Sequence, residues 1–222
     1  MDEGRIERHE GPGARLPGIG NAAPLFRART TMGEVSLDQH RGRWLVFFSH
    51  PADFTPVCTS EFVSLARAAP RFEAMGCALL GLSVDSLYAH VAWVRAIRDA
   101  FGVEVPFPIV EDPSMAVARA YGMLDGAARD SSGVRATYFI DPGGIVRAVT
   151  WYPMNVGRSV EEMVRLLAAL QRTASDEVMT PEGWHPGGDV LLPPGLPGPD
   201  TGGAGSAAGG DAVWFHRTRS DT

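Results

Sequence analysis

The chain has 222 residues and a formal net charge of −6, and its 20 basic residues are scattered rather than gathered into a stripe. This charge distribution gives no electrostatic support for a nucleic-acid partner. With 45% hydrophobic and 21% charged residues the composition is that of a globular protein large enough for one full core. No apolar run approaches the roughly 18 residues that a membrane span requires.

The N-terminus and the cysteine count indicate a compartment. The charged first ten residues are followed by no apolar segment of the kind found in export signals. Two cysteines, Cys58 and Cys77, are too few for a disulfide framework. We therefore expect a cytoplasmic protein in which a cysteine is either a core residue or a chemical group.

The first half of the chain predicts an arm, three strands and a helix. Residues 1–23 are rich in glycine and proline without periodicity, and we expect a flexible N-terminal arm. Strand patterns occupy 25–29, 33–37 and 44–49, the last a continuous apolar run typical of a central strand covered on both faces. Apolar residues at helical spacing over 59–74 predict an amphipathic helix lying on a sheet.

The second half continues the alternation and then changes character. The expected elements are a strand at 77–84, a helix at 86–100, a strand at 107–110, a short helix at 114–121, strands at 135–140 and 145–152, and a helix at 159–174. This order predicts an α/β protein with a thioredoxin-like fold, a central mixed sheet flanked by helices, over residues 24–175. Residues 176–222, rich in glycine and proline, predict either an extended C-terminal arm whose aromatic tip at 213–215 docks, or a disordered tail.

The stretch from His50 to Glu61, His-Pro-Ala-Asp-Phe-Thr-Pro-Val-Cys-Thr-Ser-Glu, connects the buried strand to the amphipathic helix. Thr55 is a suitable N-cap and Pro56 suits the first helical position, which places Cys58 in the first turn. There the sulfur meets unpaired backbone N–H groups at the positive end of the helix dipole. This environment favours the thiolate, which is the nucleophilic form of cysteine.

The neighbours of Cys58 indicate what it attacks. Pro51 and Pro56 stiffen the loop and shield the sulfur from bulky reagents, and the Thr55 hydroxyl can accept a hydrogen bond from one peroxide oxygen and donate one to the other. Cleavage of an O–O bond needs charge stabilisation on the departing oxygen, for which a fixed guanidinium is well suited. The loop therefore fits a small, polar ligand with two oxygens.

The pattern Pro51-x-x-x-Thr55-x-x-Cys58 resembles the active-site signature of peroxiredoxins. The longer string from Ser49 to Glu61 is similar to that of the one-cysteine subgroup and of archaeal and bacterial thioredoxin peroxidases, and the resemblance extends over residues 16–193. It implies a thiol-dependent peroxidase that reduces hydrogen peroxide and small organic hydroperoxides through a sulfenic acid at Cys58.

The same resemblance implies roles for further residues. Arg135 would bind the peroxide and hold the thiolate, Arg158 would be a supporting arginine, and Glu61 would orient both. His50 would lie near the sulfur and help to bind or polarise the substrate. Other interpretations remain open: a surface salt bridge for Arg135 and Glu61, a solvated first-turn position for Arg158, and a structural hydrogen bond for His50.

The second cysteine is not expected to resolve the first. Cys77 follows the helix by a path of about 24 Å from Cys58 at 1.5 Å per residue, whereas a disulfide needs Cα atoms within about 7 Å. We interpret Cys77 as a core residue. Some archaeal relatives that the chain resembles through the C-terminal arm carry resolving cysteines there, whereas this chain has His216 at about the corresponding place. The resemblance thus implies a one-cysteine cycle completed by an external thiol or a thioredoxin-like protein, with no cofactor.

Assembly and competing functions follow from the remaining features. The strand at 145–152 is apolar enough to need a cover at a sheet edge, and the resemblance implies a homodimer, with decameric rings common in the family. A thioredoxin-type disulfide oxidoreductase would need Cys-x-x-Cys, where this chain has Cys58-Thr-Ser-Glu61. A metal site on His50 and Cys58 lacks further ligands at suitable spacing. A redox-switched holdase or peroxide sensor is compatible with the sequence.

Overall fold

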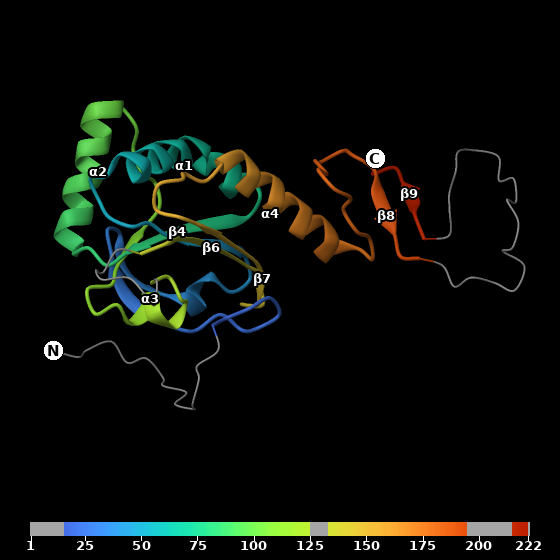
Figure 1. The fold of residues 1–222 in the computed structure, drawn as a ribbon, viewed down its shortest axis with the longest axis horizontal. Coiled ribbons are helices and arrows are strands. Elements are labelled where there is room, and N and C mark those ends of the chain that lie inside the picture. The colour runs from blue at the N-terminus through green and yellow to red at the C-terminus, as the bar shows by residue number, and fades with distance from the viewer. Residues whose placement is uncertain (1–15, 125–132, 195–214, 222) are drawn as a thin grey trace, which may run out of the picture. The chain divides into compact units, whose positions relative to one another are not determined.

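The computed structural model describes residues 16–124, 133–194 and 215–221 (Figure 1). The chain divides into two compact units, Met1–Val160 and Glu161–Thr222. Elements of the first unit, in chain order, are β1 (Arg27–Thr30), β2 (Gly33–Ser36), the 3-10 helix η1 (Leu37–His40), β3 (Trp44–Ser49), α1 (Pro56–Ala74), β4 (Cys77–Ser83), α2 (Leu87–Phe101), β5 (Ile109–Glu111), α3 (Ala116–Ala120), β6 (Arg135–Ile140) and β7 (Val146–Tyr152).

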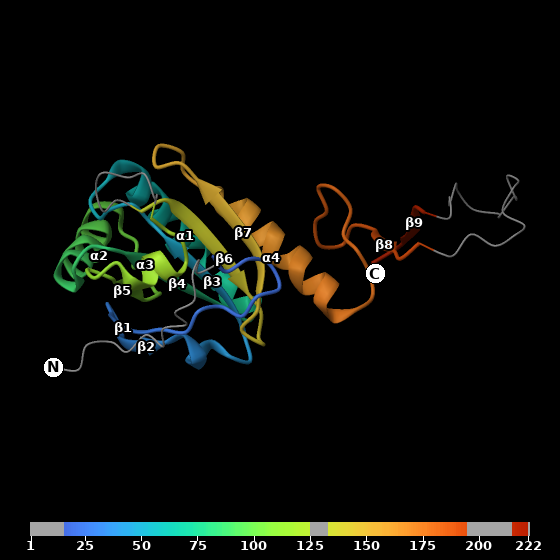
Figure 2. The same cartoon turned by 60° about the horizontal axis from the view of Figure 1, so that its bottom comes forward.

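The strands of the first unit form one mixed sheet in the order β2-β1-β5-β4-β3-β6-β7 (Figure 2). Strand β3, in the interior of the sheet, runs parallel to β4 and antiparallel to β6. Every residue of β3 is buried, because both faces of the sheet are covered. The predicted α/β fold with a central mixed sheet flanked by helices is thereby confirmed.

Alternate residues of β3 pack into two separate layers. Phe47 meets Tyr121, just after α3, with ring centroids 4.9 Å apart. Phe48 points to the other face and meets Phe62 of α1 at 5.7 Å. Helices α1 and α3 accordingly lie on opposite faces of the sheet (Figure 1). Helix α1 starts just beyond the carboxyl end of β3, so the loop between them is anchored at both ends.

The predicted N-terminal arm is partly described. Residues 1–15 lie outside the described residues, whereas residues 16–23 run along the sheet. The Gly20 N–H donates to the Val146 carbonyl at 2.8 Å, and Ala22 forms an isolated bridge with Ile145. Backbone pairing therefore holds residues 20–22 against the start of β7.

The second unit contains most of helix α4 (Val160–Ser175), which agrees with the helix predicted at 159–174. It also contains two antiparallel strands that the sequence did not predict, β8 (Val190–Leu192) and β9 (Arg217–Arg219). Ala169, Val178, Trp184 and Val190 form a small buried cluster. Of the predicted aromatic tip, residues 213 and 214 lie outside the described residues, and Phe215 is exposed.

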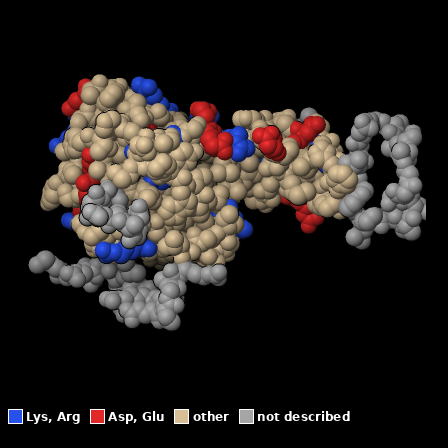
Figure 3. Space-filling model, in the orientation of Figure 1, with Lys and Arg blue, Asp and Glu red and all other residues tan. Residues whose placement is uncertain are grey.

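The molecular surface carries mixed charge. Basic and acidic side chains are interspersed over the face shown in Figure 3. Among the described residues, no helix combines the length and the apolar character needed to cross a bilayer.

Candidate active site

Cys58 lies at the start of α1, in the position that the sequence predicts. Thr55 occupies the N-cap position in an extended conformation and Pro56 is the first helical residue. The first intrahelical bond runs from the Thr59 N–H to the Thr55 carbonyl at 2.9 Å, so the N–H of Cys58 precedes the hydrogen-bonded turns. The thiol has an exposed fraction of 0%. Cys58 is thus a buried sulfur at the positive end of a helix of 19 residues.

The side chain of Thr55 makes a different hydrogen bond from the one that the sequence predicts. The hydroxyl caps no backbone N–H of the helix and donates instead to the Ala52 carbonyl at 2.9 Å. A hydroxyl has one proton, so in this arrangement Thr55 can accept a hydrogen bond from a ligand but cannot also donate one. The predicted double role for Thr55 therefore requires the bond to Ala52 to break.

Arg135 is the charged residue that touches the sulfur. It opens β6, is 2% exposed, and places Nη1 at 3.3 Å from Cys58 Sγ. The same Nη1 donates to Glu61 Oε2 at 2.8 Å, while Nε and Nη2 both donate to the Met154 carbonyl, at 2.9 and 2.6 Å. Contacts on three sides fix the guanidinium, so that little freedom is left to lose when a ligand binds.

Glu61, one turn after Cys58, joins Arg135 to Arg158. Its Oε1 accepts from the backbone N–H and Nε of Arg158 at 2.7 and 2.9 Å, and its Oε2 accepts from Nη2 at 2.8 Å. The remaining Nη1 of Arg158 donates to the Ala136 carbonyl and to the Thr137 hydroxyl of β6. Arg158 is therefore a buried structural anchor of Glu61, and the alternative of a solvated residue does not apply.

The charges of this network are unbalanced without a thiolate. Glu61, Arg135 and Arg158 are all buried, so two guanidinium groups face one carboxylate. Burial by itself raises the pKa of Glu61, but the hydrogen bonds and attraction of Arg158, with a contribution from Arg135, outweigh it and hold that pKa below the ordinary value. A thiolate at Cys58 would neutralise the remaining positive charge, and buried charges are stable only when paired.

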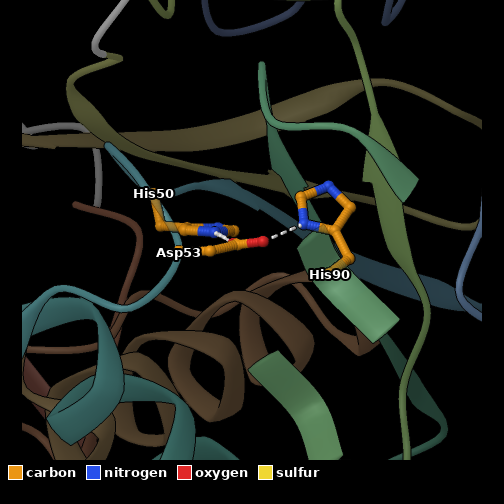
Figure 4. Close-up of side chains that lie close together, drawn as sticks. All are labelled: His50, Asp53 and His90. Atoms are coloured by element: carbon orange, nitrogen blue, oxygen red, sulfur yellow. Dashed lines mark hydrogen bonds and ion pairs between the residues drawn. The ribbon is translucent and has the colours of Figure 1, made fainter. Parts of the chain in front are cut away.

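His50 belongs to a different cluster (Figure 4). At the end of β3 it places Nε2 at 2.7 Å from Asp53 Oδ1, and His90 of α2 places Nδ1 at 2.7 Å from Asp53 Oδ2. Burial lowers the pKa of His50, although Asp53 opposes the shift. The structure thus shows a hydrogen bond at the strand end, as in the alternative interpretation of His50, and among the described residues His50 forms no hydrogen bond or ion pair with Arg135 or Cys58.

Sequence reasoning did not identify Asp53 and His90 as members of this cluster. Asp53 lies within the recognised loop, but His90 stands 37 positions away on another helix, and no local spacing links the two. Among the described residues, His50, Asp53 and His90 also form the group whose ligand atoms lie close enough, within 4.8 Å, to hold a metal ion. Pro51 is buried beside them in the same loop.

Cys77 opens β4 and pairs with Trp44 of β3. Both cysteines are free thiols. Burial raises the pKa of Cys77 to about 12, so this thiol stays protonated and unreactive at neutral pH. Cys77 therefore behaves as a small core residue.

Comparison with known proteins identifies relatives of the chain. The sequence profile described as the AhpC/TSA family matches residues 19–149. Peroxiredoxin 2 of Caldanaerobacter subterraneus subsp. tengcongensis is 45% identical over 183 residues, which cover 82% of this chain and 83% of that protein. The peroxiredoxin of Aquifex aeolicus is 48% identical over 172 residues, covering 77% and 78% of the two chains.

Solved structures show the same similarity. A yeast mitochondrial 1-Cys peroxiredoxin is 40% identical with a TM-score of 0.76, covering 81% of this chain and 88% of that one. A cysteine-to-serine mutant of peroxiredoxin 6 of Arenicola marina is 34% identical with a TM-score of 0.75, covering 81% and 85%. The chain therefore belongs to the AhpC/TSA family and is a peroxiredoxin, a peroxidase of the oxidoreductase class.

Proposed function

We propose that this peroxiredoxin reduces hydrogen peroxide and small organic hydroperoxides through a sulfenic acid at Cys58, and that an external thiol restores the cysteine. The observation that carries the proposal is the 3.3 Å contact between Arg135 Nη1 and the buried Cys58 sulfur. Arg135 is held there by Glu61 and by the Met154 carbonyl. A rigid cation beside a helix-start sulfur is suited to both thiolate formation and charge development on a departing oxygen.

The chemical step follows from this geometry. The Cys58 thiolate attacks one peroxide oxygen, the S–O bond forms as the O–O bond breaks, and the departing hydroxide or alkoxide takes up a proton as water or alcohol. Arg135 stabilises the negative charge as it moves from sulfur to the departing oxygen. Cys58 is left as a sulfenic acid, the first and reversible stage of thiol oxidation.

The buried position of Cys58 supports selectivity for small substrates. Its exposed fraction of 0% leaves no approach for a bulky reagent, whereas a peroxide needs little space. Pro51 is buried in the loop, and the Thr55 hydroxyl can accept from a peroxide O–H while it donates to Ala52. Size and hydrogen bonding thus favour the same class of substrate.

The return step requires a second molecule. A first external thiol displaces water from the sulfenic acid and forms a mixed disulfide at Cys58, and a second thiol then releases the Cys58 thiol and an external disulfide. Cys77, the one other cysteine of the sequence, is buried and protonated at neutral pH. The similar yeast mitochondrial 1-Cys peroxiredoxin has its thiol resolved via glutathione and thioredoxin systems, which supports the same class of reductant here.

We also propose that the protein is a homodimer that can build larger rings. Strand β7 lies at the edge of the sheet, and apart from its first residue, Val146, which bonds to Gly20 and Asn21, its backbone groups on one side have no partner strand within the described residues. Trp151 of β7 is 45% exposed, and Met154 and Val156 just beyond it are also exposed. Pairing with β7 of a second copy would cover this apolar edge.

Peroxide consumption tests the proposal. Wild type and the matched variants Cys58→Ser and Cys77→Ser are each supplied with hydrogen peroxide and, in turn, with glutathione and with thioredoxin plus its reductase. We expect turnover by wild type and Cys77→Ser with at least one reductant, and none by Cys58→Ser. Equal turnover by Cys58→Ser would contradict the proposal.

A further inference from the structure

Ser49 is a buried polar residue at the end of β3, a strand whose other members are apolar. A buried hydroxyl lowers stability unless it finds hydrogen-bond partners. Ser49 Oγ has two: it donates to the Val134 carbonyl at 2.6 Å and accepts from the Ala136 N–H at 3.1 Å. These partners are the residues on either side of Arg135, whose guanidinium contacts the Cys58 sulfur.

The Ser49 hydroxyl continues a backbone pairing that has ended. The register between β3 and β6 stops at the pair of Phe48 and Thr137. The first two residues of β6, Arg135 and Ala136, lie beyond that pair, and on their other side they face β7 at the edge of the sheet (Figure 2). A hydroxyl has one proton and two lone pairs, so it can supply the donor and the acceptor of one further backbone pair. Ser49 therefore connects the start of β6 to the interior of the sheet.

Ser49 and Cys58 lie on opposite faces of the sheet. Side chains alternate between the two faces along a strand. Phe48 points toward α1, so Ser49 shares the face of Phe47, away from the helix that carries Cys58. Ala136 belongs with Phe47 to the buried cluster on that face. Ser49 is thus placed to influence the sulfur through the backbone of β6.

Ala136 also links Ser49 to the ionic network of the site. Its N–H donates to Ser49 Oγ, and its carbonyl accepts from Arg158 Nη1 at 3.0 Å. Arg158 in turn binds Glu61, which binds Arg135. The hydroxyl of Ser49 holds the backbone around Arg135, and Glu61 holds the guanidinium. The two ends of the Arg135 side chain are therefore fixed separately.

The contact between Arg135 and Cys58 depends on where β6 begins. Nη1 of Arg135 lies 3.3 Å from the sulfur, while Nε and Nη2 bond to the Met154 carbonyl. A displacement of about 1 Å near a reacting group can cost about 100-fold in rate. A shift of the first residues of β6 would either move the guanidinium away from the sulfur or break its bonds to Met154.

We propose that Ser49 is a positioning residue for the peroxidase reaction: its hydroxyl holds the backbone on both sides of Arg135 and so sets the place of the guanidinium beside Cys58. Loss of the hydroxyl leaves the fold in place but lets the start of β6 move away from β3. The effect on peroxide reduction rests on the proposed function, whereas the placement of Arg135 does not.

The resting protein gives the first readout. Proton–nitrogen NMR of the full-length chain detects the amide of Ala136 and the Nε–H of Arg135, the latter assigned from its loss in Arg135→Lys. In wild type we expect both hydrogens to exchange slowly with solvent, because each is bonded in a buried residue. Ser49→Ala should shift the Arg135 signal and speed both exchange rates. Ser49→Thr, which keeps the hydroxyl, should behave like wild type.

The rate of Cys58 oxidation by hydrogen peroxide gives the second readout. We expect a loss of about tenfold for Ser49→Ala and recovery to within about threefold of wild type for Ser49→Thr. Thr30→Val is the matched control. The buried Thr30 hydroxyl also donates to a carbonyl, that of Gly33 at 2.7 Å, and accepts from the Met32 N–H at 3.0 Å, but β1 is separated from β3 by two strands. Thr30→Val should keep the wild-type rate and spectrum.

A double-mutant cycle separates an effect through Arg135 from a general effect of the substitution. Arg135→Lys alone should slow Cys58 oxidation by about 100-fold. If Ser49 acts through Arg135, adding Ser49→Ala to Arg135→Lys should change the rate by less than about twofold, because the fork that Ser49 positions is already lost.

Fast exchange of the Ala136 amide in wild type would overturn the inference without any variant, so it is tested even if Ser49→Ala does not fold. Equal oxidation rates for Ser49→Ala and wild type would exclude the positioning role, as would a further loss of about tenfold on top of Arg135→Lys. Equal losses in Ser49→Thr and Ser49→Ala would exclude the hydroxyl as the cause. Wild type that shows the expected spectrum but consumes no peroxide would refute the proposed function alone.

Discussion

At the scale of single residues, Glu61 and Arg135 determine the geometry around the sulfur. Glu61 accepts hydrogen bonds from both arginines, and Arg135 uses all of its nitrogens on Cys58, Glu61 and Met154. Each group is buried, so each depends on the other for its charge to be tolerated. Substitutions here should therefore affect stability and reactivity in ways that can be separated.

Glu61→Gln should destabilise the fold in a pH-dependent manner. The pKa of Glu61 is below its ordinary value of 4.5 in the folded protein, so its stabilising contribution is present above pH 4.5 and is lost as the pH falls through the lower folded pKa. Breaking a buried ion pair costs about 3–5 kcal/mol at pH 7. Urea unfolding of wild type and Glu61→Gln should show a difference that shrinks at acidic pH. A difference that is constant from pH 7 downwards would contradict the charged role.

Arg135→Lys should keep the positive charge but lose the fork of donors. A single ammonium cannot contact Cys58, Glu61 and Met154 at once, so we expect Cys58 oxidation by peroxide to slow by about 100-fold. Stopped-flow measurement gives the rate constant. Arg27→Lys, at an exposed ion pair, is the control and should react like wild type. Equal rates for Arg135→Lys and wild type would remove Arg135 from the mechanism.

The residues of this site were only partly predictable. The spacing of Pro51, Thr55 and Cys58 is local, and a proline-braced helix start has a recognisable pattern. Arg135, by contrast, meets Cys58 across 77 positions, and only the resemblance to a family indicated it. Neither a local sequence pattern nor the resemblance to a family indicated His90, because its contact with Asp53 depends on how α2 packs in the folded chain.

At the scale of elements, α1 contributes residues to the candidate active site, whereas β7 forms an edge of the sheet. The start of α1 carries Cys58 and Glu61 one turn apart on the same helix face, and β6 carries Arg135 opposite them. Among the strands of the described residues, β7 pairs with β6 alone, and Gly20 and Asn21 bond to its first residue, Val146. Predicted element boundaries in the first unit agree closely with the structure because apolar period and capping residues are local properties. Strands β8 and β9 were missed, since they are three residues each and pair across a long intervening segment.

Trp151→Arg should weaken self-association through the β7 edge. The indole is 45% exposed and a charged side chain in its place would be costly to bury against a second copy. Multi-angle light scattering after gel filtration should show a smaller species than wild type. The matched variant Tyr88→Arg, at an exposed aromatic on α2, should leave the assembly unchanged. Identical masses for wild type and Trp151→Arg would exclude this edge as the interface.

At the scale of the whole molecule, the two cysteines lie in different environments. Cys58 lies beside a buried arginine at a helix start, whereas Cys77 lies in β4 with its pKa raised to about 12 by burial. In the proposed mechanism Cys58 is therefore the reactive thiol and Cys77 stays inert. The proposed cycle consequently depends on a reductant from outside the chain.

Cys77→Ala should leave peroxide consumption unchanged within a factor of about two and cost about 1 kcal/mol of stability as a small core change. Alkylation with iodoacetamide at pH 7.5, followed by peptide mass spectrometry, should label native Cys77 only after unfolding. Rapid labelling of Cys77 in the folded protein, or lost activity in Cys77→Ala, would assign that thiol a part in the cycle.

The most direct test of the whole account is the intact mass of the protein after one equivalent of hydrogen peroxide without any reductant. Wild type should gain one oxygen atom, mapped to Cys58 after trapping with dimedone, and Cys58→Ser should gain none. Wild type that gains no oxygen, or that loses two hydrogens to form a disulfide between Cys58 and Cys77, would contradict the one-cysteine mechanism.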